Sequence, residues 1–141
     1  MDLNDFVDVE YINLITYKKD KTPVTTPVWV ADYSGSLVVT TSLNAGKVKR
    51  VRNNGEATIY VTNQSGSEKL SESLDLQASL IEEPSLKKQA ADVIRKKYGL
   101  MAKMIMKGPD ENRAIIKLEN KGGVKWYVQN AVVKTKAKLN Y

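Results

Sequence analysis

The chain contains 141 residues, of which 42% are hydrophobic and 27% are charged. These values are typical of a globular protein, so we expect one domain over residues 1–141 and neither a disordered nor a fibrous chain. No apolar run reaches the roughly 20 residues of a bilayer-spanning helix, and the first residues are acidic where a secretory signal is basic. We therefore expect a cytoplasmic protein.

Cysteine and histidine are both absent from the sequence. Their absence excludes thiol nucleophiles, Ser-His-Asp triads and the usual zinc sites, and it removes the most common general base near neutral pH. If the protein catalyses a reaction, we expect a bound cofactor to carry the reactive group, while the protein supplies position and electrostatics. We expect no catalytic side chain and no metal site.

Lysine and arginine outnumber the acidic residues by 22 to 16, which gives a formal net charge of +6. A basic chain favours anionic partners, which include nucleic acids, phosphorylated small molecules and anionic lipids. Net charge alone does not choose among these classes.

The hydrophobic pattern predicts mainly strands, with helices inserted between them. A short helix capped by Asp2 or Asn4 opens the chain. The predicted strands lie at residues 11–18, 23–33, 37–41, 57–62, 74–81, 114–119 and 124–128, the helices at about 42–52 and 84–98, and a lysine-bearing tail at 132–141. Because turns join most of these strands, we expect a mainly β, antiparallel barrel of about six strands, closed or partly closed.

Pro27 interrupts the predicted strand at residues 23–33. Proline cannot donate a hydrogen bond to a strand ladder, so this residue should lie at a sheet edge or a bulge. Free backbone groups at such a place are available to a ligand.

The segment from Lys47 to Arg52 contains four cations in six residues, and on a helix Lys47 and Arg50 share one face while Lys49 and Arg52 share another. Cations near a helix start oppose the helix dipole unless an anion is held there. The segment therefore predicts either a phosphate site or a solvated basic face.

Three hydroxyl residues, Thr40, Thr41 and Ser42, precede this helix and are suited to contacts with a phosphate or a ring edge. We expect their side chains to point toward the helix start, and Ser42 or Asn44 to cap it. β propensity and a simple helix cap are the alternative explanation.

These segments together resemble the pyridoxamine 5'-phosphate oxidase-like superfamily, also called the FMN-binding split barrels. The resemblance is carried by 25–30, the turn at Ser34 and Gly35, 39–41 and 46–54, and by 96–100, which looks like the branch of small FMN- or F420-dependent proteins. The superfamily implies a split-barrel homodimer with the cofactor between subunits, in a flavin-dependent oxidoreductase that acts on a small-molecule substrate.

The resemblance also implies roles for individual residues. Thr41 matches the strand-end threonine and Lys47 the lysine that meets the cofactor phosphate, while Arg50 matches a basic residue of the deazaflavin branch. The strand facing the isoalloxazine ring corresponds to Thr25, Thr26, Pro27, Val28 and Trp29. The full set of expected cofactor-binding residues adds Thr40, Ser42 and Gly46 to these.

The sequence departs from the oxidases proper in two places. Gly46 stands where they have an arginine before the lysine, and the chain has no histidine for their Arg-x-His substrate motif. We therefore expect FMN, or alternatively F420, and a substrate other than pyridoxamine phosphate.

Other functions and partners stay open. The basic helix and tail also suit a nucleic-acid-binding barrel, although no strand shows the alternating surface aromatics of a base-stacking platform. Trp29 and Trp126 are candidates to stack on a cofactor ring, with Trp126 supplied by a partner subunit, or they are core residues. The apolar residues Met101, Met104 and Met106 belong to the core or to a dimer interface.

Overall fold

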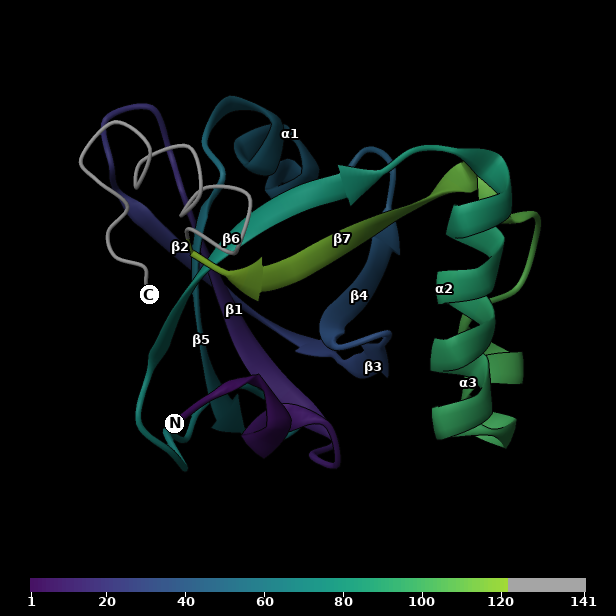
Figure 1. Ribbon diagram of the computed structural model, residues 1–141, viewed down its shortest axis with the longest axis horizontal. Helices are drawn as coiled ribbons and strands as arrows, with labels where there is room; N and C mark the ends of the chain where they lie inside the picture. The colour runs from purple at the N-terminus through teal and green to yellow at the C-terminus, as the bar shows by residue number, and fades with distance from the viewer. Residues whose placement is uncertain (122–141) are drawn as a thin grey trace, which may run out of the picture.

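The computed structural model describes residues 1–121 as a curved antiparallel sheet with helices at its ends and along one side (Figure 1). The predicted strand at 124–128, the lysine-bearing tail at 132–141 and Trp126 lie outside the described residues. The elements in chain order are η1 (Leu3–Phe6), β1 (Tyr11–Tyr17), β2 (Pro23–Trp29), β3 (Ala31–Tyr33), β4 (Ser36–Ser42), α1 (Gly46–Asn53), β5 (Glu56–Thr62), β6 (Leu74–Ile81), α2 (Pro84–Tyr98), α3 (Leu100–Ile105), η2 (Asp110–Asn112) and β7 (Arg113–Asn120).

Over residues 1–121 the sheet has seven strands in the order β2-β1-β5-β6-β7-β4-β3 and does not close, so the expected count of six is wrong, as is full closure of the barrel. The difference arises within one predicted strand. Residues 23–33 form two strands, β2 and β3, which pair at opposite ends of the sheet order. The other predicted strands up to residue 119 are found, and Pro27 lies on the edge strand β2, as expected.

The break between β2 and β3 falls at Val30, whose backbone leaves the strand ladder. The Val30 N–H donates to the Tyr98 hydroxyl at 3.0 Å, and the Val30 carbonyl accepts from Lys97 Nζ at 2.6 Å. A buried backbone group without a partner is costly, so these contacts stabilise the break. The end of α2 therefore holds the point where the barrel splits.

Hydrophobic residues form two cores, one inside the curved sheet and one between its outer face and α2 and α3. Leu14, Leu37 and Ile59 belong to the inner core, which η1 and α1 cover at opposite ends through Phe6 and Val51 (Figure 1). The outer core contains Trp29, Val38, Ile94 and Ile115. Both faces of the sheet are thus buried where α2 packs.

The split leaves a seam between β2 and the second half of β4. β4 pairs with β3 only over its first half, from Ser36 to Val38, after the tight turn at Ser34 and Gly35, whose φ angles are 53° and 86°. Beyond Val38, residues 39–42 pair with β7 on one side, and no strand of the described chain pairs on the other. Unpaired backbone groups therefore border the seam. No helix of residues 1–121 is both long and apolar enough to cross a membrane.

Candidate functional site

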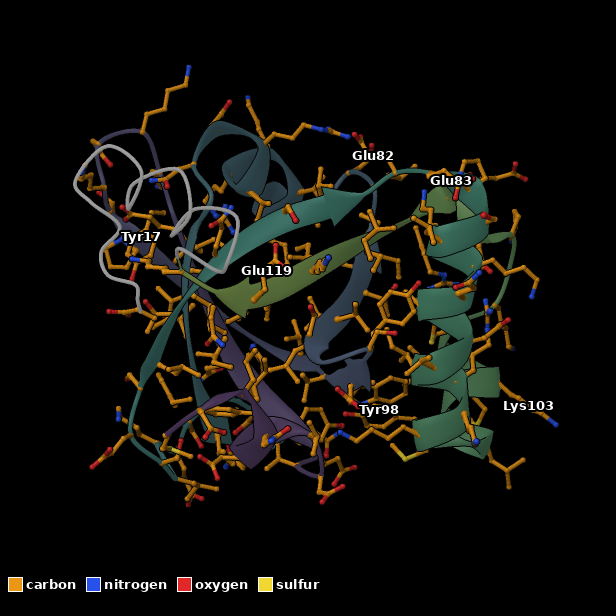
Figure 2. The ribbon with its side chains drawn as sticks, viewed as in Figure 1. Tyr17, Glu82, Glu83, Tyr98, Lys103 and Glu119 are labelled. Atoms are coloured by element: carbon orange, nitrogen blue, oxygen red, sulfur yellow. The ribbon has the colours of Figure 1, made fainter. Side chains whose placement is uncertain are left out.

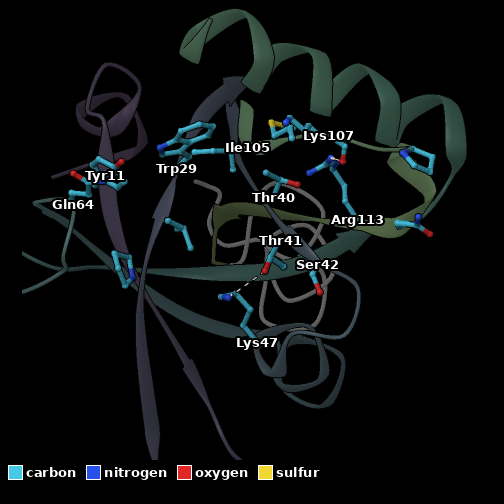
Figure 3. A pocket seen from close by; sticks show the side chains of 15 residues that line it. Tyr11, Trp29, Thr40, Thr41, Ser42, Lys47, Gln64, Ile105, Lys107 and Arg113 are labelled. Atoms are coloured by element: carbon cyan, nitrogen blue, oxygen red, sulfur yellow. Dashed lines mark hydrogen bonds between the residues drawn. The ribbon is translucent and has the colours of Figure 1, made fainter. Parts of the chain in front are cut away.

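A pocket of about 580 Å³ opens at this seam (Figure 3). Its volume lies within the range of small-molecule and cofactor sites. The residues that line it are Tyr11, Pro27, Val28, Trp29, Thr40, Thr41, Ser42, Lys47, Gln64, Ile105, Met106, Lys107, Pro109, Asn112 and Arg113.

Seven of the eleven residues expected from the sequence line this pocket, and the fold brings them together from β2, β4 and α1. They are Pro27, Val28, Trp29, Thr40, Thr41, Ser42 and Lys47. The other four lie outside its lining. Thr25 and Thr26 are earlier on β2, opposite Ile15 and Leu14 of β1.

Arg50 and Gly46 lie next to each other on α1, and neither lines the pocket. The Arg50 Nε donates to the Thr16 hydroxyl at 2.7 Å, and its guanidinium folds back over Gly46, where an added Cβ would lie 2.8 Å from Nη1. Gly46 thus leaves room for Arg50 to lie along the helix. Arg50 borders a separate groove of about 310 Å³ with Tyr17 and four other residues: Lys18, Lys19, Lys49 and Asn53. We call it the basic groove.

Lys47 is the cation of α1 that reaches the pocket. Its Nζ donates to the Thr41 hydroxyl at 3.3 Å, and it has no ion pair within residues 1–121. Burial, and to a lesser extent the nearby Arg50 guanidinium, lower the pKa of Lys47 from its ordinary value. A partly buried ammonium without a carboxylate partner is stabilised by a bound anion. Val48 and Val51, which lie between the two basic faces of α1, are buried, as expected.

The three hydroxyls of β4 do not point the same way, so this expectation is wrong. Successive side chains of a strand alternate between its faces, and only Thr41 contacts Lys47. Thr40 donates to the Ala114 carbonyl at 3.3 Å, and Ser42 accepts from the Asn44 N–H at 3.2 Å. The predicted cap by Ser42 or Asn44 is also wrong, because Ala45 occupies the cap position of α1 and makes no side-chain bond there.

Trp29 forms an aromatic wall of the pocket and is held from behind by Tyr98. The two rings stack with centroids 4.1 Å apart and planes inclined by 6°. Tyr98 reaches from α2 toward the sheet (Figure 2), and its hydroxyl donates to the Glu10 carbonyl at 2.6 Å. Burial raises the pKa of Tyr98 to about 12, so the hydroxyl keeps its proton at neutral pH. Trp29 is only 8% exposed and therefore serves both core and pocket.

Sequence reasoning missed the other side of the pocket. The missed lining residues are Tyr11, Gln64, Ile105, Met106, Lys107, Pro109, Asn112 and Arg113. They come from β1, a loop and the segment from α3 to β7, and no local motif links them to Lys47. The one signal available was the turn-forming Gly108-Pro109 pair between an apolar segment and a strand, which marks a loop without showing what it covers.

Charge in the pocket lining is of one sign: Lys47, Lys107 and Arg113 are cationic, and no acidic residue of the described chain lines the pocket. No cluster of acidic residues within 1–121 could hold a metal ion. A positive pocket with an aromatic wall and unpaired backbone at its border fits a planar ring system that carries a phosphate. The donor set therefore suits a flavin-type cofactor.

Comparison with known proteins identifies the fold. The sequence matches no family model and no curated protein. Among solved structures, HutZ, the heme storage protein from Vibrio cholerae, has a TM-score of 0.63 and 15% identity, covering 81% of this chain and 83% of its own. A Listeria innocua protein provisionally assigned as a pyridoxamine 5'-phosphate oxidase has a TM-score of 0.58 and 18% identity, covering 79% and 84%.

An F420 reductase is also similar, with a TM-score of 0.55 and 17% identity over 82% of this chain and 90% of its own. The chain has the pyridoxamine 5'-phosphate oxidase-like fold. At these identities the comparison concerns the fold alone, because proteins of one fold carry different functions. The expected resemblance in fold is thus confirmed, and two of these similar structures are named for different ligands, heme and F420.

Proposed function

We propose that the chain binds FMN in the seam between β2 and β4 and acts as a flavin-dependent oxidoreductase on a small substrate. The observation that carries this proposal is Lys47, a partly buried cation beside the Thr41 hydroxyl in a pocket to which residues 1–121 contribute no acidic side chain. Such a site favours a phosphate, whose oxygens accept charge-assisted hydrogen bonds.

Each group of the pocket has a part in this proposal. Lys47 and Thr41 bind the phosphate, with Ser42 at the same strand end. Trp29, Pro27 and Val28 give an apolar wall for the ring system, and the unpaired backbone of β4 offers donors and acceptors to its polar edge. A bound flavin supplies the electron or hydride transfer, which no side chain of this pocket provides.

F420 is the alternative cofactor, because it also combines a three-ring system with a phosphate, and an F420 reductase shares the fold. HutZ is named for heme storage, yet this chain has no histidine, the most common protein ligand of heme iron. The proposal therefore keeps a flavin or deazaflavin. Mass spectrometry of the molecule released on denaturation distinguishes the two.

Replacement of Lys47 tests the site directly. A charge-assisted hydrogen bond contributes about 1.5 to 3 kcal/mol, so Lys47→Ala should weaken FMN binding by roughly ten- to a hundredfold. Binding is measured by the quenching of FMN fluorescence.

Lys49→Ala is the matched control, since Lys49 lies on the same helix, is exposed and faces the basic groove. It removes one cation from α1 and should change FMN affinity much less. Riboflavin lacks the phosphate, so its affinity should be nearly the same in the wild type and in Lys47→Ala. Equal losses for the two lysines, or for FMN and riboflavin, would place the phosphate elsewhere. Salt-sensitive DNA or RNA binding with no flavin binding would favour the nucleic-acid alternative.

A further inference from the structure

The pocket holds a second group of cations, at a distance from Lys47. Arg113 begins β7, and Lys107 lies in the loop between α3 and η2. Figure 3 shows Lys47 at the lower end of the pocket and Lys107 and Arg113 in its upper part, with Thr40 and Thr41 between them. The proposed cofactor phosphate needs only the Lys47 end.

The Arg113 guanidinium is held in place by its neighbours. Its Nε donates to the Asp110 carboxylate and its Nη2 to the Lys107 carbonyl, both at 3.3 Å. The side chain is 11% exposed, and within residues 1–121 neither N–H of Nη1 has a partner. Arg113 thus lines the pocket in a fixed orientation, and its Nη1 group is available to donate hydrogen bonds to a ligand.

Asp110 does not cancel this charge, because it also accepts two hydrogen bonds from Arg95 on α2. Arg95 also pairs with Asp92, which Lys88 shares, so three cations meet two carboxylates and the network keeps a net positive charge. The ion pairs with the two guanidinium groups lower the pKa of Asp110. Lys107 adds a further cation and has no ion pair among the described residues.

The two cationic ends lie on different faces of β4. Thr41, which contacts Lys47, lies on the same face of β4 as Leu37 and Val39 of the inner core. Ser42 lies directly opposite Arg113 on the neighbouring strand β7. Adjacent residues of a strand point to opposite faces. One small anion at Lys47 is therefore not placed to occupy Arg113 as well.

We propose that Arg113 and Lys107 form a subsite for a carboxylate or phosphate group of the substrate, so that the substrate is a small organic anion. The inference deepens the proposed function, since it treats the Lys47 end as taken by the cofactor phosphate. Arginine binds both oxyanions through pairs of N–H donors, and Asn112 and Thr40 supply polar groups beside it.

A titration with inorganic phosphate tests the subsite on the FMN-loaded protein. The chain has four arginines, so their Nε–H signals are separable by NMR, and Arg113→Lys assigns the signal of Arg113 by its loss. Phosphate should shift the Arg113 signal in a saturable way. Arg52, exposed on α1, should show only the small shift that sodium chloride of equal ionic strength produces.

Lys107→Ala should weaken this phosphate binding by about tenfold, the loss of one charge-assisted contact. Lys103→Ala is the matched control: Lys103 is an exposed lysine of the neighbouring α3, lies outside the pocket lining and points away from the body of the molecule (Figure 2). It should leave phosphate affinity unchanged. Both residues are exposed, so neither variant endangers the fold.

Two results would overturn the subsite: an Arg113 shift no larger than that of Arg52, or equal effects of the two lysine variants. A third result would assign Arg113 to the cofactor and so also overturn the subsite. In that case FMN itself would shift the Arg113 signal in a saturable way, and phosphate would then have no further effect on it. If FMN does not bind at all, the titration is run on Lys47→Ala without cofactor. A retained Arg113 response there supports the anion subsite even though the proposed cofactor has failed.

Discussion

At the residue scale, Lys47 shows how the surroundings of a side chain determine what it can do. The same helix carries Lys49 and Arg52 in solvent, whereas Lys47 is partly buried beside Thr41. Burial lowers the pKa of Lys47 and a bound phosphate raises it again, so ligand binding and protonation are linked.

The linkage gives a prediction for pH. As pH rises through the lowered pKa of Lys47, the ligand-free protein loses the charge that the phosphate needs, so FMN affinity should begin to fall below pH 10.5, the ordinary lysine value. Titration of the phosphate itself, with a second pKa of about 6, lies below this window. Fluorescence titrations from pH 7 to 11 measure the effect.

Lys47→Arg supplies the control, because arginine stays charged over this range and should keep FMN affinity flat. An identical fall in Lys47→Arg would assign the pH dependence to another group. For stability without ligand the sign is opposite: the unfolded chain binds the extra proton between the two pKa values, so the free energy of unfolding rises with pH in that window.

At the scale of elements, the end of α2 decides where the barrel opens. Lys97 Nζ donates to the carbonyls of Val7, Val9 and Val30 at 3.0, 2.6 and 2.6 Å, and thereby joins the N-terminal segment to the break between β2 and β3. Burial lowers the pKa of Lys97, while Asp8 and Glu10 oppose the shift. The role of residues 96–100 is thus structural at the break and indirect at the pocket.

Lys97→Met should destabilise the protein by about 2 kcal/mol, since it removes a charged donor from three carbonyls while keeping most of the side-chain volume. Urea unfolding measures the change. Lys96→Met alters an exposed neighbour on the same helix and should change stability by less than about 0.5 kcal/mol. A similar small effect for both variants would show that water replaces the Lys97 ammonium without cost.

At the scale of the whole molecule, α3 presents an apolar face that the described chain leaves uncovered. Leu100, Met104 and Ile105 are 76%, 72% and 65% exposed, whereas Met106 is buried. The Met101 to Met106 segment is thus divided between surface and core. Ile105 also lines the pocket, so this face continues into its mouth. We propose that a second copy of the chain covers it in a homodimer.

Met104→Glu should then weaken dimerisation by at least tenfold, because a charge would have to be buried at the interface. Leu70→Glu is the matched control: Leu70 is 57% exposed and lies in the loop after β5, outside this face. Sedimentation equilibrium with FMN present measures both. A wild-type protein that is monomeric at every concentration would refute the dimer.

The sequence by itself determined the strands and helices, because their signals are local. Period-two alternation marks residues 74–81, Pro84 and Gly99 bracket α2, and Val48 and Val51 predict the buried face of α1. Seven of the expected site residues followed from three such segments and from their resemblance to known proteins.

Only the tertiary structure decided the break at Val30, the position of Arg50 and the cationic end at Lys107 and Arg113. Local pattern cannot show the break, since Val28, Trp29, Val30 and Ala31 are all buried and belong alternately to two cores. Arg50 and Lys47 share a helical face in the sequence pattern, but the space above Gly46 and the Thr16 hydroxyl direct Arg50 elsewhere. Arg113 meets Ser42 through strand pairing across 71 residues of sequence, and such pairing depends on the whole sheet.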